Sequence, residues 1–164
     1  MLTQERLKEL LSYDSATGLF ARMVSGHGVK VGDAAGTLCK GYIQIKINRR
    51  KYYAHRLAWL YVYGELPTHD TDHINMDRAD NRIANLRLAT RSENNFNTGK
   101  QANNTSGFRG VSWKNTSKKW CAEARLNGEH HHLGYFTTPE EADVAYRAFV
   151  QRHHGEFLYQ GDTA

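Results

Sequence analysis

The first forty residues carry one short pattern of apolar positions. Leu7, Leu10 and Leu11 recur at helical spacing in the segment that begins near Thr3, and leucines at this spacing share one side of a helix. Polar residues and a glycine at 13–18 end the pattern. We therefore expect a short N-terminal helix, followed by a glycine-rich approach to the next element.

Residues 41–54 alternate between apolar and polar side chains, as a half-buried strand does. Ile43, Ile45 and Ile47 point to one face, and a turn after them can lead into a second strand at 51–54. Six Lys or Arg and no acid lie between residues 40 and 56, so the predicted hairpin has a basic outer surface. The side chains of this surface that we expect to contact a polyanion are Lys46, Arg49 and Arg50.

A buried helix and a polar loop follow the hairpin. The apolar stretch at 55–63 predicts the helix, which ends at Gly64. Residues 68–84 hold many Asp and Asn side chains and few apolar ones, a composition typical of a strand end followed by a shaped loop. Thr90 and Glu93 then form a capping box that starts another helix.

The C-terminal third predicts a separate unit of three strands and one helix. Strand patterns occupy 108–113, 120–126 and 130–136, and Asn127-Gly128 is a strong hairpin turn between the last two. An N-capping Thr138, a proline and a capping-box glutamate start the helix. Its apolar face, suited to lying across a three-stranded sheet, consists of Ala142, Ala145, Tyr146 and Phe149.

Composition narrows the class of protein. A chain of 164 residues allows one medium domain or two small ones. No apolar run approaches the roughly 20 residues that cross a bilayer, and the N-terminus lacks the pattern of a secretory signal. We therefore expect a cytoplasmic protein with no membrane partner.

The cysteines and the net charge narrow the class further. Cys39 and Cys121 lie far apart and form no CxxC pair, which argues against a disulfide-linked partner and a cysteine zinc site. The 22 Lys and Arg exceed the 17 Asp and Glu, giving a net charge of +5 that suits a polyanion partner.

Four motif pieces in the central region occur in a recognisable order. They are HRLAW at 55–59, DHIN at 72–75, DNRIANLR at 80–87 and SEN at 92–94. They resemble the phage and intron-encoded HNH homing endonucleases, and the resemblance covers residues 40–98. It implies a ββα-metal fold and hydrolysis of DNA phosphodiester bonds.

The resemblance also implies a role for four residues. His73 would be the general base that takes a proton from the attacking water, and Asn85 would orient its ring. Asp72 and Asn94 would hold one divalent metal ion, Mg²⁺ or Mn²⁺. A histidine of pKa about 6.5 can accept that proton at neutral pH, and Mg²⁺ prefers oxygen ligands of this kind.

Residue types alone leave other interpretations of the same side chains open. Asp72 and His73 could be ordinary loop residues, and the asparagines could form turns and caps. Adjacent residues of a flat strand point to opposite faces, so Asp72 and His73 can serve one site only at a twist or a strand end. His55 could be a site residue or a structural histidine at a helix start.

The C-terminal unit has a resemblance of its own, over residues 104–155. SGFRGVS at 106–112, KWCAEAR at 119–125, LGYF at 133–136 and EEADVAY at 140–146 look like an AP2 DNA-binding domain. In that family the sheet enters the major groove. Ser112, His130 and His132 stand where plant-type members have other residues, so we expect either a different target sequence or contacts mainly with the DNA backbone. The residues to which DNA contact is carried over are Arg109, Glu123 and Arg125, followed by Lys114, Lys118 and His130.

Taken together, these patterns predict an α+β protein. The expected parts are an N-terminal segment at 1–40, an HNH module at 41–98, a linker at 99–106, an AP2-like domain at 107–155 and a tail at 156–164. The expected function is metal-dependent cleavage of double-stranded DNA, in the cytoplasm of a bacterial host if a phage encodes the chain. The alternative is a non-catalytic, sequence-specific DNA-binding regulator. Whether the protein is a monomer or a homodimer stays open.

Overall fold

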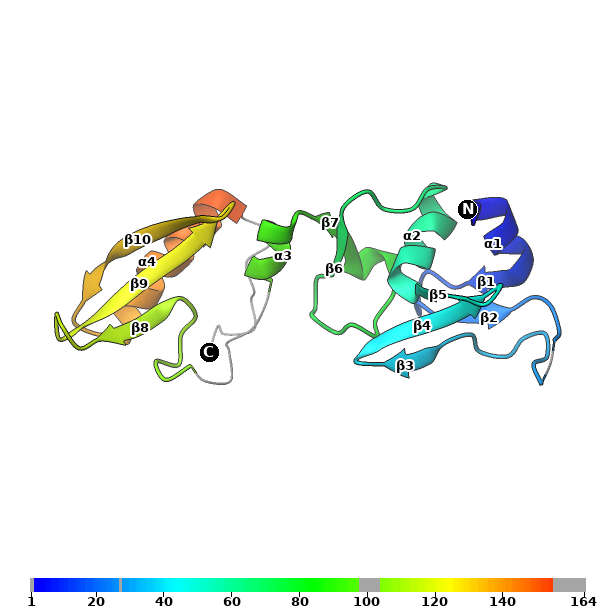
Figure 1. The fold of residues 1–164 in the computed structure, drawn as a ribbon, viewed down its shortest axis with the longest axis horizontal. Helices are drawn as coiled ribbons and strands as arrows, with labels where there is room; N and C mark the ends of the chain where they lie inside the picture. Colours follow the sequence, from blue (N-terminus) through cyan, green and yellow to red (C-terminus); the bar gives the residue numbers. More distant parts are fainter. Residues whose placement is uncertain (1, 27, 98–103, 155–164) are drawn as a thin grey trace. The chain divides into compact units, whose positions relative to one another are not determined.

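The computed structural model describes residues 2–26, 28–97 and 104–154. The chain divides into two compact units, Met1–Ala89 and Thr90–Ala164, which are drawn with their elements in Figure 1. Residues 99–103 of the expected linker and the expected tail at 156–164 lie outside the described residues. None of the described helices is both long and apolar enough to cross a membrane.

The N-terminal helix forms as predicted, but two strands follow it that the sequence did not reveal. Helix α1 (Gln4–Leu10) is capped by the Thr3 side chain. Strand β1 (Leu11–Tyr13) pairs antiparallel with β2 (Phe20–Arg22). Three residues per strand are too few for a periodic pattern to stand out.

The predicted basic hairpin forms two strands of a three-stranded sheet. Strand β4 (Tyr42–Ile47) lies between β3 (Thr37–Cys39) and β5 (Arg50–Tyr53). Asn48 and Arg49, with φ of 48° and 65°, form the two-residue turn between β4 and β5, because a tight hairpin needs left-handed backbone at both positions. The third strand, β3, was not predicted.

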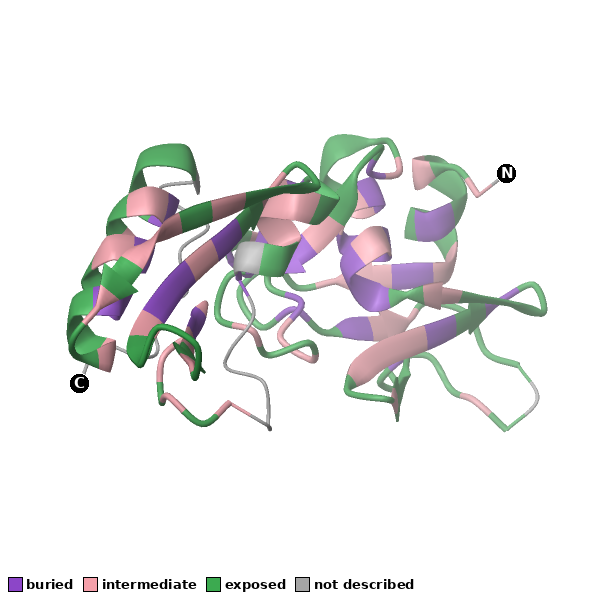
Figure 2. Cartoon of the chain, turned by 60° about the vertical axis from the view of Figure 1, so that its left-hand side comes forward, coloured by how far each residue is buried: buried purple, intermediate pink, exposed green. Residues whose placement is uncertain are grey.

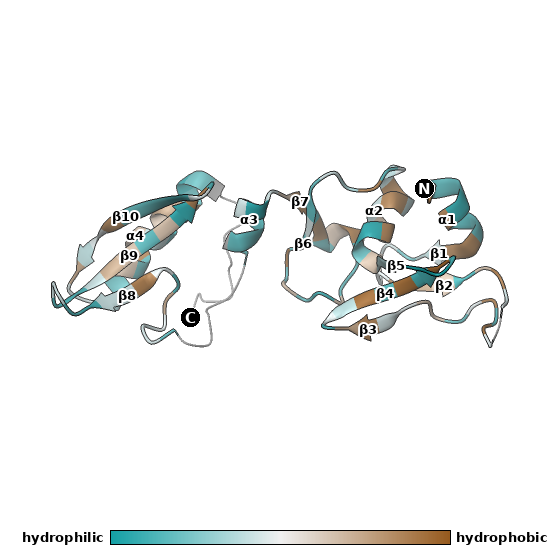
Figure 3. Ribbon diagram, viewed as in Figure 1, coloured by the Kyte–Doolittle hydropathy of each residue, from teal (hydrophilic) through white to brown (hydrophobic). Residues whose placement is uncertain are grey.

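Helix α2 (Ala54–Tyr63) confirms the predicted buried helix and ends at Gly64, whose φ is 86°. It contributes Leu57 to the core of the first unit, together with Leu7, Leu11 and Ile45. These four side chains have 0% exposure. Apolar residues of α2 and β4 are brown in Figure 3.

The candidate site is built on a two-stranded ladder in the same unit. Strand β6 (Asp70–His73) pairs antiparallel with β7 (Leu86–Ala89), and the short 3₁₀ helix η1 (Ile83–Asn85) directly precedes β7. The polar loop predicted after His73 thus runs between the two strands.

The second unit contains the predicted three strands and helix. After α3 (Arg91–Phe96), which starts with the predicted capping box, the sheet consists of β8 (Val111–Lys114), β9 (Lys119–Leu126) and β10 (Glu129–Phe136), with β9 in the middle. Helix α4 (Pro139–His154) covers one face of it. Ala122 and Ala124 of β9 pack against Ala142, Tyr146 and Val150 of α4. Buried positions are purple in Figure 2.

At one glycine, the backbone between the two N-terminal strands lies very close to the loop of the candidate site. Gly18 lies between β1 and β2 with φ of 75°, and a Cβ atom there would lie 2.4 Å from the backbone N of Arg82 and 2.6 Å from the carbonyl carbon of Asn81. Gly32 has a similar φ of 90° and nothing within 4 Å of the Cβ position. Replacing each of the two glycines by alanine therefore distinguishes the cost of left-handed backbone, which both positions share, from the cost of steric overlap, which only Gly18 has.

We expect Gly32→Ala to cost about 1–2 kcal/mol of stability, the cost of left-handed backbone at an alanine. Gly18→Ala should cost about 1–3 kcal/mol more, because the loop at 81–82 must move to admit the methyl group. Urea unfolding of the two variants measures the difference. Equal unfolding midpoints would contradict the close approach of the two segments.

Candidate active site on the β6–β7 ladder

The end of β6 buries an acid and a histidine side by side. Asp72 and His73 are each 5% exposed, and in the ladder they lie opposite Arg87 and Leu86. The Nε and Nη2 atoms of Arg87 donate to Oδ2 of Asp72 at 2.9 and 2.8 Å. A buried carboxylate needs such a partner because desolvation of a charge is costly.

The loop after His73 is closed by the side chain of Asn85. Its Oδ1 accepts a hydrogen bond from the backbone N–H of Asn75 at 3.0 Å, and its Nδ2 donates to Oδ1 of Asn75 and to the carbonyl of Asp80, both at 2.9 Å. Asn85 is 7% exposed. The amide thus links both ends of the loop, and it acts on the segment that follows His73.

Further polar groups of the loop bond one another. The side chains of Asn75 and Asp77 accept backbone hydrogen bonds from Asp77 and Ala79. Asp80 accepts from Arg82 and from the amide of Asn75. The bonds from Arg82 lower the pKa of Asp80 to about 2, so this carboxylate is ionised at neutral pH.

Asn81 is the buried amide next to the His73 ring. It is 2% exposed, and its Nδ2 donates to the carbonyl of Ala79 at 2.8 Å. The hydroxyl of Tyr13 on β1 donates to the Asn81 carbonyl at 2.8 Å. The N-terminal strands therefore support the site, a role that the sequence did not reveal.

Burial sets the protonation of His73. Burial lowers its pKa from the ordinary histidine value, while a hydrogen bond with Asn81 and the charge of Asp72 act in the opposite direction. The net effect is a lower pKa, so the ring is neutral at pH 7. A neutral imidazole is the form that accepts a proton.

A cluster of aromatic rings also contacts His73. The ring of His55 stands edge-on to it, with centroids 5.1 Å apart, and stacks on Tyr53 at 5.3 Å. Tyr42 contacts both histidines. Burial, His73 and Arg56 lower the pKa of His55 to about 3, so His55 is also neutral.

The oxygen atoms that could ligate a metal near His73 suit a hard cation that takes few protein ligands. The carboxylate of Asp72 could offer an oxygen ligand, and a metal ion bound there would share it with Arg87. In the described part of the chain, no group of three His, Cys, Asp or Glu ligands surrounds His73. Mg²⁺ keeps several waters and commonly takes one or two protein ligands. Asn94 lies on α3 of the second unit, so its partnership with Asp72 stays a prediction.

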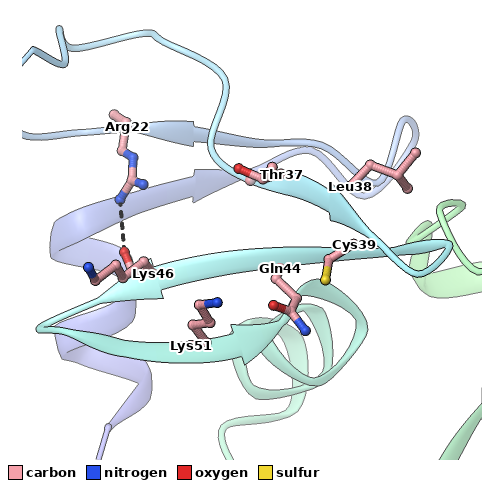
Figure 4. Close-up of a pocket in the computed structure, with 8 residues that line it drawn as sticks. Arg22, Thr37, Leu38, Cys39, Gln44, Lys46 and Lys51 are labelled. Atoms are coloured by element: carbon pink, nitrogen blue, oxygen red, sulfur yellow. Dashed lines mark hydrogen bonds between the residues drawn. The ribbon is translucent and has the colours of Figure 1, made fainter.

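A basic pocket lies beside the three-stranded sheet β3–β4–β5 of the first unit. It has a volume of about 360 Å³, and the cations that line it are Arg22, Lys46 and Lys51. In Figure 4, Arg22 reaches from β2 to the backbone carbonyl of Lys46, at 3.5 Å. Lys46 is one of the side chains expected to contact a polyanion. The sequence did not point to Arg22, because the short strand β2 that carries it has no recognisable pattern. Arg49 and Arg50 are exposed at the adjacent hairpin turn.

In the second unit, the sheet face opposite α4 collects most of the predicted contact residues. Lys114 donates to Oε2 of Glu123 at 3.1 Å, and Nε2 of His130 lies 3.8 Å from Oε1 of Glu123. Arg125 is exposed on β9 and lies opposite His130 in the register of β9 and β10. Lys118 lies in the turn before β9.

Arg109 is positioned differently from the other predicted contacts. It precedes β8, and its guanidinium donates to the backbone carbonyl of Asn95 on α3. Its role in DNA contact stays a prediction.

Comparison with known proteins gives three matches. The HNH endonuclease family model matches residues 52–96. Protein 3.8 of Escherichia phage T7 is 30% identical over 104 residues, which is 63% of this chain and 85% of that protein. An uncharacterized HNH endonuclease of Acanthamoeba polyphaga mimivirus is 32% identical over 109 residues, 65% of this chain and 56% of that protein. No solved structure matches the chain.

The family match and the site coincide in sequence. The matched residues run from β5 to α3 and contain the ladder, the Asn85-closed loop and the residues His55, Asp72, His73, Asn85 and Asn94. Residues 52–96 of the chain are therefore an HNH endonuclease domain.

Proposed function

We propose that this protein is a homing-type, metal-dependent DNA endonuclease in which His73 is the general base. The observation that carries the proposal is the neutral, buried His73 ring at the end of β6, held beside Asp72 by a loop that Asn85 closes. Hydrolysis of a phosphodiester needs a water molecule that has lost a proton. A positioned histidine base contributes about 10²–10⁴-fold to such a reaction.

The protein groups around His73 have separable tasks. Asn81 and the His55 edge restrain the ring. Asn85 positions the base indirectly, by closing the loop that follows it. Asp72 and Asn94 would hold the divalent ion, which supplies charge stabilisation to the leaving oxygen when bound.

DNA binding would use two surfaces. In the first unit, the cations around the pocket and at the β4–β5 turn suit a phosphate backbone. In the second unit, the three strands and helix are consistent with an AP2-like domain that contacts DNA through the sheet face carrying Arg125. Two weak contacts on one chain raise the effective concentration of each surface at the DNA.

The phage relative suggests a setting for this activity. Escherichia phage T7 encodes a protein that resembles most of this chain. We infer that the present protein acts on DNA in the cytoplasm of an infected bacterium.

His73→Ala should strongly slow cleavage and leave DNA affinity unchanged, because the variant loses the proton acceptor but keeps the basic surfaces. We expect the cleavage rate of a DNA duplex to fall by at least about 10²-fold, with less than twofold change in Kd. Fluorescence anisotropy measures the Kd, and a denaturing gel measures strand cleavage.

His69→Ala is the matched control, since His69 is exposed and pairs with Thr68. It should cleave at the wild-type rate. Equal cleavage by wild type and His73→Ala would refute the assignment of the base.

Arg125→Ala should weaken DNA binding about tenfold, because it removes an exposed cation from the proposed sheet surface. The slope of log Kd against log salt should fall by about 1, as expected for the loss of one phosphate contact. Lys30→Ala removes an exposed cation outside both surfaces and should change neither quantity. The same salt slope in Arg125→Ala and wild type would show that Arg125 makes no phosphate contact.

A further inference from the structure

Three side chains of types that ligate transition metals lie on the β8–β9–β10 sheet, on the face that α4 does not cover. They are Cys121 and Glu123 on β9 and His132 on β10, and one ligand atom from each lies within 4.8 Å of the other two. Cys121 and Glu123 share a face because they are two residues apart on the strand. His132 lies directly opposite Glu123 in the antiparallel pair.

The register of β10 contributes to this convergence. His132 follows the pairing that starts at the hairpin, but the register shifts between His132 and Gly134, so that Tyr135 lies opposite Cys121. Such a β-bulge changes the direction of nearby side chains. The His132 ring packs against Tyr135, with centroids 4.7 Å apart, and it stays close to the thiol.

The spacing of the sulfur and nitrogen atoms already matches that of zinc ligands. Sγ of Cys121 and Nδ1 of His132 are 3.4 Å apart. In a tetrahedral zinc site, bond lengths of about 2.3 Å to sulfur and 2.0–2.1 Å to nitrogen place the two ligand atoms about 3.5 Å apart. The carboxylate of Glu123 can then approach by a change of side-chain torsion.

We propose that Cys121, Glu123 and His132 form a binding site for a transition-metal ion, with Zn²⁺ as the preferred occupant and water as the fourth ligand. A thiolate and an imidazole favour Zn²⁺ over Mg²⁺ or Ca²⁺, which bind oxygen ligands. The site belongs to the second unit and does not depend on the proposed nuclease chemistry of the first.

Two groups must change state when the ion binds. The Cys121 thiol, whose pKa is raised by burial and by the charge of Glu123, releases its proton to the solvent as the metal–sulfur bond forms. Lys114 leaves Glu123 and becomes solvated, which its partial exposure permits. The two negative ligands then balance the charge of the ion.

Cobalt titration of the reduced, metal-free full-length protein tests the proposal, because Co²⁺ bound to a thiolate gives a charge-transfer band in the near ultraviolet. We expect this band to saturate at one equivalent, to vanish on addition of Zn²⁺ and to persist in excess Mg²⁺. An ion held by oxygen ligands in the first unit gives no such band, so the readout is specific for this site.

Cys121→Ser and His132→Ala should each remove the band or weaken cobalt binding by more than about 100-fold, beyond the effect typical of groups outside the ligand set. His132 is exposed, so its replacement should leave the fold intact, which circular dichroism checks. Cys39→Ser and His69→Ala, both in the first unit, should keep the band. Absence of the band from the wild-type protein, its loss in Cys39→Ser, or its persistence in His132→Ala would overturn the proposal.

Discussion

The candidate active site depends on a polar loop that satisfies its own hydrogen bonds. The segment between β6 and β7 buries the side-chain amides of Asn81 and Asn85. A buried polar group without a partner costs about 1–3 kcal/mol, so such a loop is stable only if its donors and acceptors meet. The Asn85 amide makes three of these bonds, and the direction of the chain after His73 follows from them.

The same constraint explains the mixture of charged and neutral groups at the site. Arginines pair with Asp72 and Asp80, and the bonds from Arg82 lower the pKa of Asp80 to about 2, so this carboxylate is ionised at neutral pH. His55 and His73 are neutral instead, because burial lowers the pKa of each ring. The loop therefore follows a neutral imidazole that lies next to a carboxylate in the chain, an arrangement compatible with the proposed hydrolysis.

Much of the fold could be predicted from the sequence, because its signals are local. The capping box at Thr90, the hairpin turn at Asn127-Gly128 and the apolar face of α4 each lie within one turn or one helix. Strands β1, β2 and β3 could not be predicted, because three-residue strands are stabilised by pairing with distant partners and not by a pattern of their own.

The site divides in the same way. The motif pieces pointed to Asp72, His73 and Asn85, but the partnership of Arg87 with Asp72 follows from the register of a ladder that joins residues fifteen positions apart. The support of Asn81 by Tyr13 crosses 68 positions. The two-residue turn at Asn127-Gly128 sets the register that places His132 opposite Glu123, whereas the register shift after His132, next to its contact with Cys121, has no recognisable sequence pattern.

Incubation of the wild-type protein with supercoiled phage or plasmid DNA, in Mg²⁺ and in EDTA, tests the central claim most directly. The arrangement around His73 predicts nicked or linear DNA in Mg²⁺ and unchanged supercoiled DNA in EDTA. Binding to the same DNA without strand cleavage in Mg²⁺ or Mn²⁺, on DNA that includes the native genomic context, would contradict it and favour a non-catalytic DNA-binding regulator.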